Sequence, residues 1–377
     1  MQFPLKAGAL SRRHWLVGVA AAGLAGSGNG LPPAPEDGRA PQGVPARFAA
    51  LWRAAPRVRE PARVALLAAA LTGDRVVAVG EHCVVALSDD GGRRWRQAAA
   101  VPTSVTLTAV GFADGGTGYA VGHGGVVLAS RDGGEHWEML TDGRRLAALM
   151  LEDAQALAQA GHPRAPGLLR EARQLVADGP DKPLFDLHVV GAARVVIVGS
   201  YNLCFETRDG GRSWTPWQDR LDNPRARHLY ALCTHGDTWL IAGEQGLLLR
   251  SRDGGRHFDG LPSPYVGSWF TATVTAEGRW LLAGLRGHVY GAEDDAMRWQ
   301  PLQGGGSASF VDAVTLGDDS VLLVDQAGTL YRSRAGAALS ALAGTPLPPP
   351  SQVLPMPGGG LLVLGLTGAR LLPGPTP

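Results

Sequence analysis

One eight-residue pattern occurs four times in this chain and limits what the chain can fold into more than any other feature. The copies are SDDGGRRW at 88–95, SRDGGEHW at 130–137, TRDGGRSW at 207–214 and SRDGGRHF at 251–258. Each begins with Ser or Thr, continues with Asp and two Gly, and ends on an aromatic residue. The positions that define the pattern are Ser88, Asp90, Gly92 and Trp95; Ser130, Asp132, Gly134 and Trp137; Thr207, Asp209, Gly211 and Trp214; and Ser251, Asp253, Gly255 and Phe258.

This pattern predicts a tight turn between two strands. An Asp side chain can accept hydrogen bonds from the backbone N–H groups that follow it, and Gly can adopt the positive φ of such a turn. We therefore expect Asp132→Ala to destabilise the fold by leaving turn N–H groups without an acceptor. The pattern resembles the Asp-box, also called the bacterial neuraminidase repeat. That resemblance places the turn between the third and fourth strands of a propeller blade.

A longer repeat contains the Asp-box. An apolar run that ends mostly in Gly recurs seven times, at Gly80, Gly122, Gly199, Gly243, Gly284, Asp325 and Gly365. Most intervals are about 40 to 45 residues, which is typical of a four-stranded blade. The box itself weakens: 292–299 keeps Asp294 and Trp299, 333–340 keeps Ser333, and the seventh copy has none. The repeat predicts an all-β fold, a seven-bladed β-propeller over 48–377. We expect 51–54 to supply the missing outer strand of blade seven.

The interval between the second and third repeats is longer and holds an insertion. Apolar residues follow helical spacing in both halves of 144–177, and Gly161, His162 and Pro163 separate the halves. We predict a helical hairpin. Two interpretations stay open: the hairpin packs its apolar face on the blades, or it is a docking arm for a partner.

The N-terminus has the layout of an export signal. Lys6, Arg12 and Arg13 precede an apolar stretch too short to span a membrane, and a Pro-rich segment follows. Around Arg12 and Arg13 the sequence also resembles a twin-arginine signal. We predict a signal peptide over 1–30, a linker over 31–47 and a periplasmic location. An uncleaved anchor in the inner membrane stays open as the alternative.

Composition argues against several classes of function. The net charge is +1, and removal of Lys6, Arg12 and Arg13 would bring it to −2, so nucleic acid is not an expected partner. The three cysteines, Cys83, Cys204 and Cys233, lie in apolar strand contexts. We expect buried free thiols, with a Cys204–Cys233 disulfide as the alternative. Metal-ligand spacing is missing from the sequence, so we expect no metal, no cofactor and no small-molecule substrate.

The connection between the third and fourth repeats is rich in Arg and aromatic residues, which dominate protein interfaces. A partner-binding patch is one interpretation and a solvated loop with internal Asp–Arg pairs is the other. The candidate binding residues are Trp217, Arg220, Arg225, Arg227 and His228, with Trp269 at the start of the fifth repeat.

A glycoside hydrolase or glycan-binding propeller is the alternative class of function. Sialidases carry Asp-boxes and use an Arg triad, a Tyr–Glu nucleophile pair and an Asp. This chain lacks their Arg-Ile-Pro signature, and its tyrosines have no Glu at a matching blade position. Asp186 and Asp312 fall near the expected channel, where they could also cap strand ends. We therefore predict no catalytic residues.

The export signal, the VG-x-x-G-type blades and the early DGG-x-x-W boxes together resemble the photosystem II assembly and stability factor family. That resemblance implies a non-catalytic seven-bladed propeller that holds a newly made membrane subunit. The hairpin at 144–177 resembles the relatives of non-photosynthetic bacteria, which are associated with membrane exporters. We expect a monomeric scaffold whose partner is a subunit of a membrane-protein complex.

Overall fold

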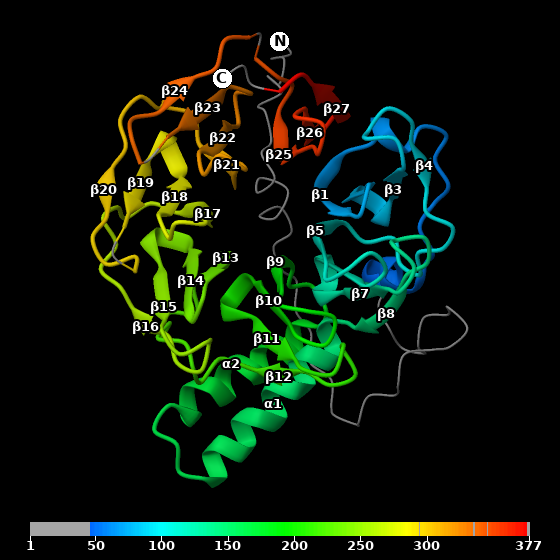
Figure 1. Cartoon of the computed structure of the whole chain (residues 1–377). Helices are drawn as coiled ribbons and strands as arrows, with labels where there is room; N and C mark the ends of the chain where they lie inside the picture. Colours follow the sequence, from blue (N-terminus) through cyan, green and yellow to red (C-terminus); the bar gives the residue numbers. More distant parts are fainter. Residues whose placement is uncertain (1–45, 294, 335, 345, 375–377) are drawn as a thin grey trace, which may run out of the picture.

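The computed structural model describes residues 46–293, 295–334, 336–344 and 346–374, so the predicted signal peptide lies outside the described residues, as do Asp294 and most of the predicted linker. Seven antiparallel sheets stand around a central axis (Figure 1). Within the described residues, six have four strands and the last has three, in simple sequential order. The chain is therefore a seven-bladed β-propeller, as the repeat predicted.

The blades follow one another along the chain. Blade one holds β1 (Leu66–Thr72), β2 (Arg75–Gly80), β3 (Val85–Ser88) and β4 (Arg96–Gln97); blade two holds β5 (Leu107–Phe112), β6 (Gly118–Gly122), β7 (Val127–Ser130) and β8 (Glu138–Thr141). Blade three holds β9 (Leu184–Val189), β10 (Val195–Gly199), β11 (Cys204–Thr207) and β12 (Thr215–Pro216); blade four holds β13 (Leu229–His235), β14 (Thr238–Gly243), β15 (Leu248–Ser251) and β16 (Asp259–Gly260). Blade five holds β17 (Trp269–Val274), β18 (Trp280–Gly284), β19 (Val289–Ala292) and β20 (Gln300–Pro301). Blade six holds β21 (Phe310–Thr315), β22 (Val321–Asp325), β23 (Leu330–Ser333) and β24 (Ser340–Ala341); blade seven holds β25 (Pro350–Pro355), β26 (Leu361–Gly365) and β27 (Gly368–Leu372).

The second strand of each blade forms the core. In β10 and β22, every residue is buried, and the sequences VVIVG and VLLVD are rich in β-branched and aliphatic residues. Such strands suit a sheet that is covered on both faces by neighbouring blades. The innermost strands are buried at their first residue and partly exposed further along, where they line the channel. Burial between blades thus explains why the strand pattern persists where the Asp-box has been lost.

Each Asp-box also packs onto the preceding blade. Gly134 has φ 90°, and a Cβ there would lie 3.1 Å from the Val77 side chain of blade one. Trp137 lies in the same buried cluster as Val77 and Leu87. Phe258 packs in the same way with Trp217 at the outer edge of blade three. The boxes therefore fill the boundary between blades as well as forming a turn.

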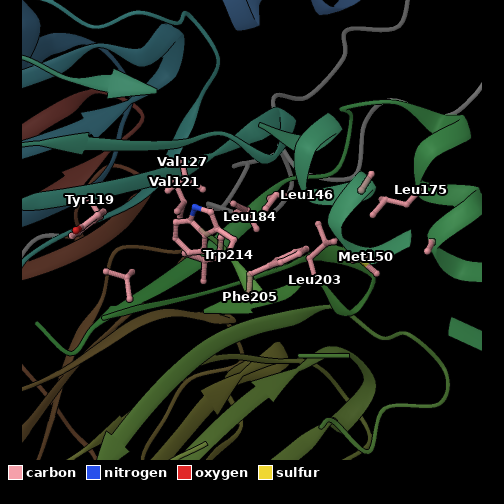
Figure 2. Close-up of a cluster of buried hydrophobic side chains, with 14 of the residues drawn as sticks. Tyr119, Val121, Val127, Leu146, Met150, Leu175, Leu184, Leu203, Phe205 and Trp214 are labelled. Carbon is pink, nitrogen blue, oxygen red and sulfur yellow. The ribbon is translucent and has the colours of Figure 1, made fainter. Parts of the chain in front are cut away.

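The predicted helical hairpin is present as α1 (Gly143–Gln159) and α2 (Ala165–Asp178). It extends from the rim of the propeller beside blade three (Figure 1). One face is buried: Leu146 and Met150 of α1 and Leu175 of α2 share a cluster with Leu203 and Phe205. Figure 2 shows these side chains meeting between the hairpin and the blade. The hairpin is thus part of the core along one face and exposed along the other.

The structure contradicts the closure expected from 51–54. Leu51 and Trp52 belong to a 3-10 helix, Ala46–Trp52, that is buried against blades one and two. The ring closes instead through the inner strands of blades seven and one. Ser351 Oγ donates to Leu66 O at 2.7 Å, and the Gln352 side-chain oxygen accepts from Ala69 N. Burial in this cluster removes the apolar side chains of Leu51 and Trp52 from water, which stabilises the helix in this place.

The described cysteines are all free, with Cys83 and Cys204 buried and Cys233 partly buried. Burial raises the pKa of all three thiols, so they are inert side chains of the core. Over the same part of the chain, no helix has the length and hydropathy needed to cross a bilayer.

Candidate functional site

The Arg-rich segment forms the connection from β12 to β13, at the end of the propeller where the innermost strands begin. Asn223 holds this loop in place: its amide nitrogen donates to Asn202 Oδ1 at 2.8 Å and Arg227 O at 2.9 Å. Its side-chain oxygen accepts from Arg227 N. Arg225 is exposed, and Arg227 and His228 are half-buried. A buried Asn thus presents two arginines on an ordered loop.

Two of the predicted binding residues are core residues. Trp217 and Trp269 are fully buried, so neither offers a surface to a partner. Trp217 packs against Trp239 and Phe258, and the Arg220 guanidinium lies 4.9 Å from its ring. Arg220 also lies 4.0 Å from Glu206, a buried carboxylate that Arg194 contacts at 2.7 Å. The prediction that Trp217 and Trp269 bind a partner was wrong. The Asp-box of blade four packs on Trp217, and Trp269 is the first residue of β17, in the interior of blade five.

An aromatic group that sequence reasoning missed lies beside the arginines. Tyr201 is 54% exposed, and its ring centroid lies 4.7 Å from that of His228. His228 in turn contacts Phe185 and Tyr230, at 6.1 and 6.0 Å between centroids. His228 Nδ1 accepts from Tyr201 N, and burial lowers the pKa of His228. The neutral imidazole of His228 thus holds the exposed Tyr201 in place by accepting its backbone N–H.

No backbone feature singles out Tyr201. Its repeat position has positive φ in blades one to five and holds His82, Gly124, Tyr201, Gln245 and Arg286. The sequence distinguishes blade three only by the aromatic side chain at this position. Lys182 adds a cation 5.1 Å from the Tyr201 ring, held by Asp178 and Asp181.

The hairpin and the Arg loop meet. Arg164, between α1 and α2, donates to Gln218 O at 3.2 Å and Asp219 O at 3.1 Å. The two docking candidates from the sequence are therefore parts of one continuous face. We call this face the mouth surface and define it by Lys182, Tyr201, Arg225, Arg227 and His228, with the exposed side of the hairpin beside it.

The channel carboxylates tie blades together. Asp186 Oδ2 accepts from Leu232 N at 3.0 Å, and Asp312 Oδ2 accepts from Val353 N at 3.0 Å. Gln352 makes the equivalent bond to blade one. These residues line a cavity of about 140 Å³ with Tyr230, and none of the described residues in that lining is an arginine. The lining thus differs from the Arg-based carboxylate clamp of sialidases.

The Asp-box residues form the predicted turns. In blade two, Asp132 Oδ1 accepts from the N–H groups of Glu135 and His136, and Ser130 Oγ accepts from Gly134 N at 2.9 Å. Hydrogen bonds from the Ser213 hydroxyl and N–H lower the pKa of the equivalent Asp209 to about 2. The Asp132 side chain is 44% exposed, whereas Ser130 is buried. The hydroxyl, rather than the carboxylate, is therefore the buried acceptor of the box.

Comparisons with known proteins agree with this geometry. A family model described as the photosynthesis system II assembly factor YCF48 matches residues 171–333, which run from α2 to the end of β23. The photosystem II assembly lipoprotein Ycf48 of Synechococcus sp. (strain CC9902) is 27% identical over 137 residues. That match covers 36% of this chain and 41% of the relative, so the chain matches less than half of the curated relative's length.

Solved structures share the fold at low identity. A structure titled "YCF48 bound to D1 peptide" has a TM-score of 0.61 and 16% identity, covering 86% of this chain and 97% of that chain. YCF48 from Cyanidioschyzon merolae has a TM-score of 0.60 and 14% identity, covering 85% of this chain and 98% of that one. These matches show that the chain is similar in sequence to Ycf48 proteins over part of its length and shares their β-propeller fold.

Proposed function

We propose that this chain is a non-catalytic scaffold that holds a segment of a membrane-complex protein during assembly, and that it does so on the periplasmic side of the inner membrane. The observation that carries the proposal is the mouth surface, where the exposed Tyr201 lies beside an ordered loop that carries Arg225 and Arg227. Tyr and Arg are the residue types that contribute most to protein-binding energy. The periplasmic location rests on the export signal predicted over 1–30.

The relatives support the class of partner. A Ycf48 structure is described as bound to a D1 peptide, and the curated relative is described as a photosystem II assembly lipoprotein. A propeller suits this role because its blades form a rigid base for the connections at one end. The hairpin extends that base outward, and Arg164 joins it to the Arg loop. We infer that the partner segment lies across the loop and the hairpin together.

The test uses a photo-crosslinking amino acid at Tyr201 in the tagged, full-length protein expressed in its native cells. We expect crosslinks to an integral-membrane protein, identified by mass spectrometry. In the same background, Arg225→Glu combined with Arg227→Glu should lower the crosslinked yield by about tenfold, since both charges on the loop are reversed. Arg225 is exposed but Arg227 is half-buried, so the thermal midpoint of the variant is measured to confirm that it folds.

Arg93→Glu combined with Arg94→Glu is the matched control. Both arginines are exposed on the blade-one Asp-box, at the opposite end of the blades. This pair should leave the yield unchanged. Equal yields from the two double variants would exclude the mouth surface as the contact, and crosslinking to polysaccharide alone would favour the glycan-binding alternative.

A further inference from the structure

A groove lies between blades five and six, at the end of the propeller opposite the mouth surface. It encloses a cavity of about 550 Å³. Leu281, Gly291 and Leu302 form an apolar floor with the buried Ser333 beside it, and Arg279 and Asp319 lie along the rim. A volume of this size is within the usual range for ligand sites.

The other blades show what fills the same position. At the boundary of blades one and two, the Asp-box of blade two packs on Val77 and Leu87 of blade one. Strand register makes Leu281 and Gly291 their equivalents, because Val77 pairs with Leu87 and Leu281 pairs with Gly291. The groove is thus the space that an Asp-box and its aromatic residue occupy elsewhere in this molecule.

Two changes leave this boundary less filled, although Leu339 stays buried in one cluster with Leu281. The turn between Ser333 and β24 is one residue shorter than in blade two, and Leu339 takes the place of Trp137 at its end. On the other side, Gly291 replaces the larger side chain found at Leu87. The side chains on both sides of the boundary between blades five and six are therefore smaller than their equivalents in blades one and two.

The partners of Arg279 also differ from those of the equivalent arginines in other blades. The arginines at its position in blades one and three, Arg75 and Arg194, donate to carbonyls of the next box, Gly133 O at 3.2 Å and Gly254 O at 3.0 Å. Arg279 Nη2 instead contacts Asp319 and Glu277, each at 2.6 Å. A guanidinium that elsewhere binds a backbone carbonyl of the box thus lies at the rim of the groove.

We propose that this groove binds an extended segment of a partner polypeptide, which inserts one aromatic side chain onto Leu281 and Gly291 and presents a backbone carbonyl to Arg279. The occupant replaces the missing Asp-box of blade six, and Trp137 and Phe258 show that an aromatic ring fits such a boundary. The rim carries both signs of charge, Arg279 and Arg298 with Glu293 and Asp319, which favours an uncharged side chain. This site does not depend on the mouth surface or on the function proposed for it.

The probe is a fluorescein-labelled peptide with the sequence of residues 209–215 of this chain, DGGRSWT, which carries the box carbonyls and the tryptophan. Fluorescence polarisation with the full-length protein should show saturable binding. Gly291→Leu fills the floor, and a Cβ there would lie 3.6 Å from Leu302, an ordinary contact. We expect this variant to weaken binding by about tenfold or more. Leu339→Trp places an indole at the position that Trp137 holds in blade two and should also weaken binding, with its thermal midpoint measured as the folding control.

Gly317→Leu is the matched control, because Gly317 lies in the β21–β22 turn of blade six and a Cβ there meets open space. It should bind the peptide as the wild type does, and a DGGRSAT peptide should not bind. Binding that is equal in the wild type, Gly291→Leu and Leu339→Trp would overturn the proposal. So would the absence of saturable binding by the wild type up to about 1 mM peptide.

Discussion

The side chains of the Asp-box have unequal roles in stability. In blade two, Ser130 is buried and its hydroxyl accepts from the N–H of Gly134, which is also buried. Asp132 is partly exposed, and water can replace it at the N–H groups of Glu135 and His136. The sequence suggested Asp132 as the critical acceptor. Because Ser130 is buried and Asp132 is partly exposed, Ser130 is the acceptor that contributes more to stability.

Ser130→Ala should therefore lower the free energy of unfolding by about 1 to 3 kcal/mol, since it leaves a buried N–H without an acceptor. Asp132→Ala should cost less than about 1 kcal/mol, because the groups it leaves are exposed. Urea unfolding followed by circular dichroism measures both. Ser130→Thr is the control, since Thr207 holds this position in blade three and accepts from Gly211 N at 2.8 Å. A larger loss for Asp132→Ala than for Ser130→Ala would contradict this ranking.

The hairpin is an element whose start depends on one capping residue. Asp142 is buried at the N-terminus of α1, where Oδ1 accepts from Arg144 N at 2.9 Å and Arg145 N at 3.3 Å. It also pairs with the Arg144 guanidinium, which lies 4.7 Å from the Trp52 ring. The cap thus connects the hairpin to the N-terminal 3-10 helix.

Asp142→Ala should destabilise the protein by about 1 to 2 kcal/mol, through loss of the cap and of the partner of a buried guanidinium. Asp142→Asn keeps a capping oxygen and should recover most of the loss. Hydrogen exchange measured by mass spectrometry should show faster exchange in α1 for the Ala variant alone. Equal exchange in both variants would mean that packing, rather than the cap, holds the start of the helix.

The whole propeller depends on how blade seven meets blade one. In the described part of the chain blade seven has three strands, and the ring is tied at the channel by Ser351 and Gln352. Asp186 and Asp312 make the same bond between blades three and four and between blades six and seven. The channel carboxylates therefore join neighbouring blades at other points of the ring, as Gln352 does where the ring closes.

Gln352→Leu should lower the free energy of unfolding by about 1 to 3 kcal/mol, because the Ala69 N–H is left buried without its acceptor. Gln352→Glu keeps an acceptor oxygen and should cost less. Thermal unfolding followed by calorimetry distinguishes them, and Gln352→Leu should also increase protease cleavage near blades seven and one. An unchanged midpoint for Gln352→Leu would show that packing alone closes the ring.

The sequence by itself determined the parts of this protein that repeat. Periods of 40 to 45 residues and four Asp-boxes predicted seven blades, and helical spacing in the longest interval predicted the hairpin. These features are local, because strand, turn and helix patterns depend on residues that are near one another in the chain. The repeat length can be determined from the sequence without knowledge of the contacts between blades.

The tertiary structure alone decided which residues face outward and which surfaces meet. Tryptophan is a residue type common in interfaces, but Trp217 and Trp269 are buried by neighbouring strands and boxes, whereas Tyr201 is exposed. The contact of Arg164 with Gln218 and Asp219, the closure at Gln352 and the groove at Gly291 each join segments far apart in the chain. The burial of a side chain depends on the neighbouring blade, and no local pattern specifies that neighbour.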